Sequence, residues 1–135
     1  VAWQVLEGRH RIPVCLLEAG SEADTGNIFL QDEIVLAGNE LLSEIRFKQG
    51  RKTLELCLQF LLRWPDINPR EQTGTPSRFR RRRREDDRLD PTLSLAAQFD
   101  HLRILDNDRY PAWFEHRGRR YILKIYPVDP KESLC

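Results

Sequence analysis

The feature that most constrains the fold is a long polar stretch, residues 65–90, that interrupts the apolar segments of the chain. Three prolines and one glycine punctuate its first half, and six arginines occupy seven positions from Arg78 to Arg84. Proline and glycine on this spacing are typical of loops, and a structureless stretch of this length is unusual inside a compact domain. We therefore expect a functional loop, a disordered tether, or a segment that is partly helical around residues 80–88.

The length of 135 residues fits one ordinary domain. We expect residues 1–64 to form a β-rich part, residues 65–90 to form an Arg-rich loop or linker, and residues 91–135 to add a helix and a β-hairpin to the same domain. The predicted fold class is α+β: a small antiparallel, hairpin-rich sheet with one main helix at about residues 91–105 and a long Arg-rich loop.

The first 64 residues show patterns of short strands and turns. Residues 2–6 alternate weakly, residues 12–17 are apolar with a proline that suits an edge strand, and residues 28–36 hold two apolar bursts. Residues 44–48 and 53–64 alternate on either side of a Gln-Gly turn. The second of these runs is also rich in good helix formers, but a helix would carry apolar residues all the way round. We therefore predict strands there.

The last third shows a helix and a hairpin. Asp90 and Pro91 suit the N-cap and the first position of a helix, and Leu95, Phe99 and Leu102 recur on one helical face. Two strand-like runs, residues 113–116 and 120–126, then flank Arg117-Gly118, which is a hairpin signal. We expect the core to form where this helical face meets the apolar faces of residues 53–64 and 120–126.

Charge is sorted along the chain. The formal balance is −6 over residues 1–44, +9 over residues 45–84 and −2 over residues 85–135, although the whole chain carries only +1. Arginine outnumbers lysine by 18 to 4, and guanidinium groups bind phosphate through two parallel hydrogen bonds and stack on bases. The basic middle of the chain therefore predicts an anionic partner.

We predict a non-catalytic nucleic-acid-binding protein that prefers RNA or single strands. The arginine run would contact phosphates, Phe79 would stack on unpaired bases, and basic residues at two predicted hairpin tips would extend the surface. The candidate residues are Arg78, Phe79, Arg80, Arg81, Arg82, Arg83, Arg84, Lys48, Arg51, Lys52, Arg117, Arg119 and Arg120. This interface requires the hairpin tips to converge on the loop.

Two alternatives stay open. On a helix, Arg81, Arg82 and Arg83 would pair with the acids four residues later, Glu85, Asp86 and Asp87, which would leave a solvated segment with no partner. In the other alternative, the chain is a protein-interaction adaptor or a regulatory subunit that binds acidic partner surfaces, including surfaces on copies of itself.

No catalytic, cofactor-binding or metal-binding motif stands out, so we predict no enzyme, no cofactor and no metal. Cys15, Cys57 and Cys135 are widely spaced, which argues against a disulfide framework. No apolar run is long enough to span a bilayer. We expect no membrane partner and an intracellular protein, either cytoplasmic or, in a eukaryotic or viral setting, nuclear.

One short segment resembles a known family. Residues 115–123, Glu-His-Arg-Gly-Arg-Arg-Tyr-Ile-Leu, are similar to the central hairpin of the small hemin-uptake proteins of bacteria. The similarity covers a small part of the chain, and we carry no function over from it.

Overall fold

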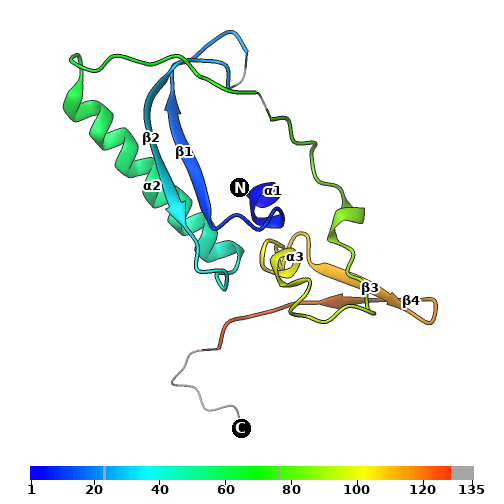
Figure 1. The fold of residues 1–135 in the computed structure, drawn as a ribbon. Helices are drawn as coiled ribbons and strands as arrows, with labels where there is room; N and C mark the ends of the chain where they lie inside the picture. Colours follow the sequence, from blue (N-terminus) through cyan, green and yellow to red (C-terminus); the bar gives the residue numbers. More distant parts are fainter. Residues whose placement is uncertain (23, 76, 129–135) are drawn as a thin grey trace.

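The computed structural model describes residues 1–22, 24–75 and 77–128. The elements follow in the order α1 (Ala2–Leu6), β1 (Arg11–Leu17), β2 (Ile28–Val35), α2 (Leu42–Arg63), the 3-10 helix η1 (Arg84–Asp87), α3 (Phe99–Arg103), β3 (Ala112–His116) and β4 (Arg119–Leu123). The strands of these residues form two antiparallel sheets, β1–β2 and β3–β4. The predicted α+β class is confirmed. Figure 1 shows α2 beside the first sheet, with α1 and α3 between the two sheets.

The first sheet is a hairpin in which Ile12 lies opposite Ile34 and Pro13 opposite Glu33. Among the described residues β1 pairs with β2 alone, so Pro13 lies in a strand with a free edge, where a missing N–H is tolerated. The strand predicted at residues 12–17 is confirmed, and the two bursts of residues 28–36 form one strand. Residues 2–6 form α1 instead of a strand, and this helix places Val5 in the core.

Residues 42–63 form one helix, so the two strands predicted at residues 44–48 and 53–64 are wrong. Glu44 accepts a hydrogen bond from the Leu41 N–H at 2.8 Å, which caps the helix, and the interior is rich in strong helix formers. The alternating apolar residues therefore spread around the helix: Leu56 is buried, whereas Leu54 and Leu58 are exposed. The main helix of the fold is α2, and it packs against β1 and β2.

Residues 91–105 form turns and the short α3, so the long helix predicted there is also wrong. Asp90 accepts a hydrogen bond from the Thr92 N–H at 2.8 Å, and the Gln98 amide bonds to both backbone groups of Asp90. These local bonds replace the first turns of a helix. The hairpin at Arg117-Gly118 is confirmed: both residues have positive φ (49° and 77°), as a two-residue hairpin turn requires.

The structure has two apolar clusters rather than the single predicted core. One gathers residues from α1, the first sheet, α2 and the end of α3: Val5, Ile12, Ile34, Leu36, Ile45 and Ile104. The other gathers Leu89, Leu102, Leu105 and Ala112, with Phe114, Leu123 and Ile125 against them. Leu102 does meet the second hairpin as predicted, but Leu95 is exposed, and residues 53–64 pack on the first sheet instead.

The described part of the chain contains no helix that is long and apolar enough to cross a membrane. Cys15 and Cys57 are free thiols, and Cys135 lies outside the described residues.

Glu40, between β2 and α2, is a buried carboxylate that connects helix α2 with helix α3. Its oxygens accept hydrogen bonds from the N–H groups of Ala37 at 2.7 Å and Gly38 at 3.0 Å. Lys48 of α2 pairs with it, and Arg103 of α3, whose side chain is 0% exposed, lies 3.6 Å away. Burial alone would raise the pKa of Glu40, but the bonds from Lys48, Ala37 and Gly38 outweigh burial and lower that pKa to about 2.

We expect Glu40→Gln to lower the free energy of unfolding by about 3 kcal/mol near neutral pH, because the buried Arg103 loses a counter-charge. The folded-state pKa lies below the unfolded one, so the contribution of Glu40 is complete above about pH 5 and is lost as the pH falls toward about 2. Urea denaturation across this pH range measures both effects. The exposed Glu71→Gln is the control and should change neither. Equal stability of Glu40→Gln and the parent at neutral pH would contradict the assignment.

Candidate functional site

The arginine run crosses the molecule as an extended strap and not as a helix. The backbone at Arg83 is extended (φ −122°, ψ 171°), and η1 begins at the next residue. Side chains of an extended chain alternate between two sides. The carboxylates of Asp86 and Asp87 are therefore met by Arg80, Arg82 and Arg84. Arg82, four positions before Asp86, donates to the Asp86 carbonyl oxygen at 2.9 Å and forms its ion pair with Asp87.

Asp86 and Asp87 form ion pairs with these three arginines. Arg80 forms a two-pronged ion pair with Asp86, and the pair holds the pKa of that carboxyl well below its usual range. Asp87 is buried and lies 3.1 Å from Arg82 and 3.4 Å from Arg84. The Arg84 guanidinium also donates to the Pro111 carbonyl oxygen at 2.7 Å. The alternative of a self-paired helix is therefore met only in part: ion pairs with Asp86 and Asp87 do form, but the run is not helical and the paired residues are different.

Trp3 of α1 contacts the same part of the run. Its indole N–H donates to the Arg80 carbonyl oxygen at 2.9 Å. The Phe79 ring is nearly parallel to the Trp3 ring, with 6.4 Å between centroids, and the guanidinium carbons of Arg80 and Arg82 lie 5.0 and 5.8 Å from the Trp3 centroid. The aromatic side chain that was expected to stack on bases therefore stacks within the chain.

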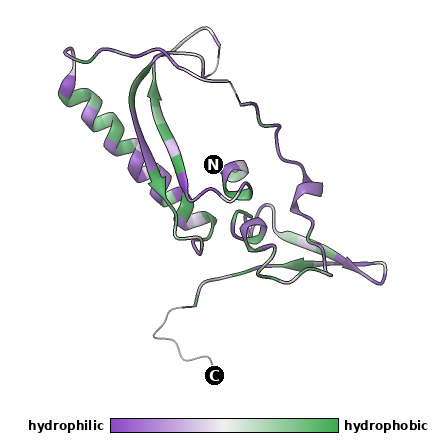
Figure 2. Ribbon diagram, in the orientation of Figure 1, coloured by the Kyte–Doolittle hydropathy of each residue, from purple (hydrophilic) through white to green (hydrophobic). Residues whose placement is uncertain are grey.

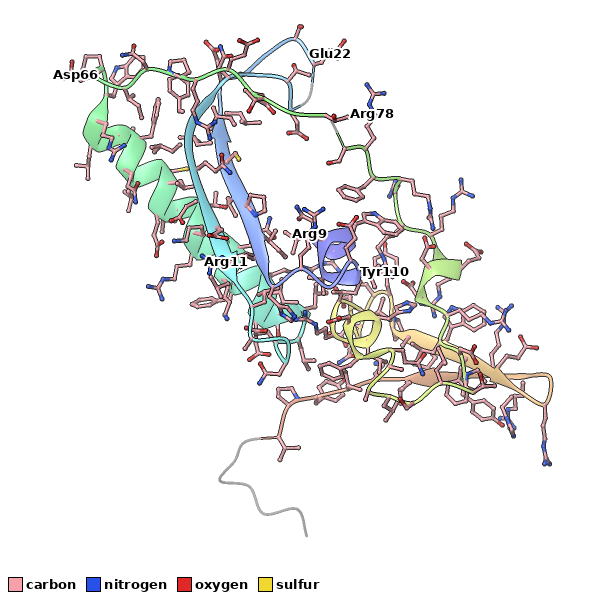
Figure 3. The ribbon with its side chains drawn as sticks, in the orientation of Figure 1. Arg9, Arg11, Glu22, Asp66, Arg78 and Tyr110 are labelled. Atoms are coloured by element: carbon pink, nitrogen blue, oxygen red, sulfur yellow. The ribbon has the colours of Figure 1, made fainter. Side chains whose placement is uncertain are left out.

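The remaining arginines of the run are Arg78, Arg81 and Arg83. All three are exposed, and their side chains form no hydrogen bond or ion pair with the part of the chain that the structure describes. Asp66 and Arg78 in Figure 3 mark the start of this connection at the end of α2 and its descent toward α1.

The other predicted basic residues do not join the strap in one surface. Lys48, Arg51 and Lys52 lie on α2 and not at a hairpin tip, and they pair with Glu40, Glu55 and Asp32 respectively. Arg117, Arg119 and Arg120 do lie at the tip of β3–β4, which Figure 1 shows on the far side of α1 and α3 from α2. The convergence that the predicted interface required is absent.

One smaller basic cluster does form on the second hairpin. The guanidinium carbons of Arg120 and Arg88 lie 4.5 and 5.5 Å from the Trp113 ring centroid. Arg88 reaches this position because residues 88 and 113 form a β-bridge, and the Leu89 N–H donates to the Trp113 carbonyl oxygen at 2.7 Å. The strap is therefore tied to β3 as well as to α1.

The β1–β2 loop has a tightly constrained backbone. Asp24 has a positive φ of 60°, a conformation that costs energy for any residue with a side chain. A Cβ on Gly26 would lie 1.8 Å from the Glu18 carbonyl oxygen, so only glycine fits there. The base of the loop is closed by the Glu18 N–H, which donates to the Asn27 carbonyl oxygen at 2.8 Å.

The connection after α2 holds this loop from outside. The Gln72 side chain donates to the carbonyl oxygen of Asp24 at 2.8 Å and also to that of Gly26. Nearby, Ile28 and Arg70 exchange backbone hydrogen bonds of 2.8 and 2.9 Å. The exposed carboxylate of Asp24 therefore lies on a backbone with a positive φ, which is held by the close contact at Gly26 and by the hydrogen bonds from Gln72. Strain of this kind concentrates at functional sites.

Sequence reasoning identified this segment only as a loop and missed Asp24. The available signal was the order Asp24-Thr25-Gly26 between two apolar runs, because aspartate tolerates the left-handed region and glycine permits close backbone contact. The described residues contain no group of three potential metal ligands.

No protein-family model matches the sequence, and no curated protein matches it. Solved structures match almost the whole chain. A methionyl-tRNA formyltransferase from Clostridium thermocellum aligns with a TM-score of 0.75 and 20% identity over 97% of this chain and 57% of its own. A protein from Mycobacterium tuberculosis, provisionally assigned as a sugar N-formyltransferase, gives 0.73 and 18% over 96% and 59%. A HypX variant from Aquifex aeolicus gives 0.70 and 18% over 98% and 25%.

At these identities the comparisons show a shared fold, and the chain spans less than two thirds of the length of these proteins. They overturn the prediction of a non-catalytic nucleic-acid-binding protein, because proteins of this fold include formyltransferases. The expectation that the chain has no enzymatic role is wrong for the same reason. Whether individual arginines bind a ligand is untested and stays a prediction.

The loop geometry predicts that alanine substitutions at two glycines of the loop change the free energy of unfolding by very different amounts. Gly26→Ala should lower the free energy of unfolding by about 1–3 kcal/mol, because its Cβ meets a backbone oxygen that cannot turn away. Gly20→Ala, in the same loop, meets first the Thr25 hydroxyl at 3.2 Å and should change stability by less than about 0.5 kcal/mol. Thermal unfolding followed by circular dichroism compares the two. Similar values would show that the loop is not closely packed.

The ion pairs of the arginine run predict how fast trypsin cleaves within it. Asp87→Asn should accelerate trypsin cleavage after Arg82 and Arg84 under native conditions, because both guanidinium groups lose their buried partner. Mass spectrometry of timed digests identifies the sites. Glu71→Gln, an exposed acid earlier in the same connection, is the control and should leave the rates at Arg82 and Arg84 unchanged. An identical pattern in Asp87→Asn and the parent would show that the carboxylate does not hold the strap.

Proposed function

We propose that this chain forms part of the catalytic domain of a formyltransferase. The observation that carries the proposal is the shared fold: 97% of the chain aligns at a TM-score of 0.75 with a methionyl-tRNA formyltransferase. The protein assigned as a sugar N-formyltransferase supports it with a TM-score of 0.73. The chain aligns with 57% of the first of these proteins, so the activity of a whole enzyme comes to this chain as a proposal.

Formyl transfer to an amine sets clear chemical demands. The amine nitrogen attacks the formyl carbon of a donor, the new C–N bond forms, and the bond from that carbon to the donor breaks. The attacking nitrogen must lose a proton, and the leaving group of the donor must gain one. A carboxylate within hydrogen-bond reach of the nitrogen can accept that proton as a general base. The reaction therefore requires a positioned acid–base group beside a bound amine.

Asp24 is the residue of this chain that best fits that role. Its carboxylate is exposed, and its backbone is held in the left-handed region by the closely packed Gly26 and by the hydrogen bond from Gln72. A group that is fixed before the substrate binds costs no reorganisation when the proton moves. In this proposal Asp24 takes the proton of the attacking amine, and the formyl donor is a second substrate that binds beside the loop.

The proposal does not name the acceptor amine or the partners of this chain. Methionyl-tRNA and sugars occur in the names of the neighbouring proteins, and those names describe those proteins. The predicted partners of this chain, nucleic acid or an acidic protein surface, are untested and stay predictions, as does an intracellular location.

The proposal predicts that Asp24→Asn lowers the rate of formyl transfer at least ~100-fold with little change in fold, because the amide cannot accept the proton. The assay uses the purified protein, a donor with a ¹³C-labelled N-formyl group, and methionyl-tRNA or amino sugars as acceptors. Mass spectrometry detects the formylated amine, and circular dichroism confirms the fold. Glu22→Gln, an exposed acid in the same loop, is the control and should keep the parent rate. Transfer that survives Asp24→Asn would remove Asp24 from the mechanism, and no transfer to any amine would contradict the proposed function.

A further inference from the structure

Helix α2 has a second apolar face that nothing in the described structure covers. Its core face carries Ile45 and Leu56, which are buried against the first sheet. On the outer side Phe47, Leu54 and Leu61 are 71%, 60% and 67% exposed, and Leu58 is exposed beside them. Figure 2 shows green segments along the whole length of α2, in contrast to the largely purple strap. Single exposed apolar residues are common, but a continuous row is typical of an interaction surface.

The spacing of this row is that of a helix pair. Phe47, Leu54 and Leu61 follow one another at intervals of seven residues, and Leu58 lies one turn after Leu54. At about 100° per residue these side chains share one face over about 21 Å of helix. A repeat of seven with an apolar residue one turn later is the seam by which two helices pack side by side. We call these four residues the outer row.

Gly50 interrupts the outer row without a local reason. Its backbone is helical and not left-handed, and a Cβ there would meet no atom within 4 Å. Glycine within a helix is unfavourable relative to alanine. In the isolated chain, therefore, nothing requires glycine at this position. A neighbouring helix that packs closely against the outer row would require it, because the missing side chain leaves a notch between Phe47 and Leu54.

We propose that the outer row is the interface of a homodimer in which two copies of α2 pack antiparallel about a two-fold axis at Leu54. Across such an axis, residues that lie equally far before and after Leu54 in the sequence contact each other. Phe47 and Leu61 lie seven residues on either side of Leu54, so each packs against the other residue in the second copy. Gly50 and Leu58 lie four residues on either side, so each Leu58 fills the notch at Gly50 of the second copy. A parallel pair would set the two notches opposite each other and leave a void.

The charges beside the outer row fit the same arrangement. Arg51 and Glu55 lie on one flank of α2 and form an ion pair of 3.0 Å. The two-fold axis places this flank on the same side of the dimer in both copies, and the two helices run in opposite directions. Arg51 of one copy then lies near Glu55 of the other, so the interface is complementary to itself.

The core face of α2 and the β1–β2 loop take no part in these contacts, so dimer formation and the proposed formyl transfer can be tested independently. A row of four apolar side chains is a small interface, for which we expect micromolar dissociation.

The first test is sedimentation equilibrium of the full chain over a wide concentration range. The expected result is a monomer–dimer equilibrium that Leu54→Glu abolishes without a change in the circular dichroism spectrum. Leu95→Glu, which replaces an exposed leucine outside α2, is the matched control and should leave the equilibrium unchanged. A monomer at every concentration would overturn the proposal and would leave the outer row to another polypeptide or another part of a longer chain. A dimer that survives Leu54→Glu would also overturn it.

Two further variants test the geometry. Gly50→Ala should raise the midpoint of thermal unfolding measured in dilute solution and yet weaken dimer formation by at least tenfold, because the methyl group occupies the notch. Leu54→Cys, in a background with the native cysteines changed to serine, should form a disulfide-linked dimer on mild oxidation, whereas Leu95→Cys should not. An unchanged dimerisation constant in Gly50→Ala, or equal cross-linking of the two cysteine variants, would contradict the antiparallel register.

Discussion

The fold depends on the buried ion pair between Glu40 and Arg103. Burying a guanidinium group is costly unless acceptors surround it, and the Arg103 side chain is fully buried. Glu40 lies 3.6 Å away, and Asp100 accepts from the Arg103 Nε at 2.6 Å. Because Glu40 precedes α2 and Arg103 ends α3, this pair connects the two apolar clusters. Lys48 adds a second positive charge to Glu40, so the start of α2 is held by the same carboxylate.

Around this connection, the arginine run acts as a structural strap. The whole connection that contains the run, residues 65–90, passes the β1–β2 loop, then Trp3 of α1, and then β3, so it contacts both sheets. Three of its guanidinium groups form ion pairs with two acids that follow closely in sequence. A charge run therefore does not identify a partner by itself, because acids a few residues away can satisfy it. The same path holds the loop that carries Asp24, which links the strap to the proposed site.

Prediction succeeded where the signal was local. The hairpin at Arg117-Gly118 follows from two residues that accept positive φ, and the β1 strand follows from an apolar run with an edge proline. Prediction failed at residues 42–63 because an apolar residue at every other position fits a strand, and also fits a helix that is apolar on two faces. It failed at residues 91–98 because the contacts between Asp90 and Gln98 compete with the first helical turns.

The sequence by itself determined the α+β class, the strands β1 and β2 and the hairpin at Arg117-Gly118, since these rest on backbone preferences of neighbouring residues. Only the tertiary structure decided which arginines meet Asp86 and Asp87, where Glu40 and Arg103 meet, and how Gln72 holds Asp24. These contacts join residues that lie far apart in the chain or depend on whether the backbone is extended or helical. Their geometry follows from packing, which no local pattern encodes.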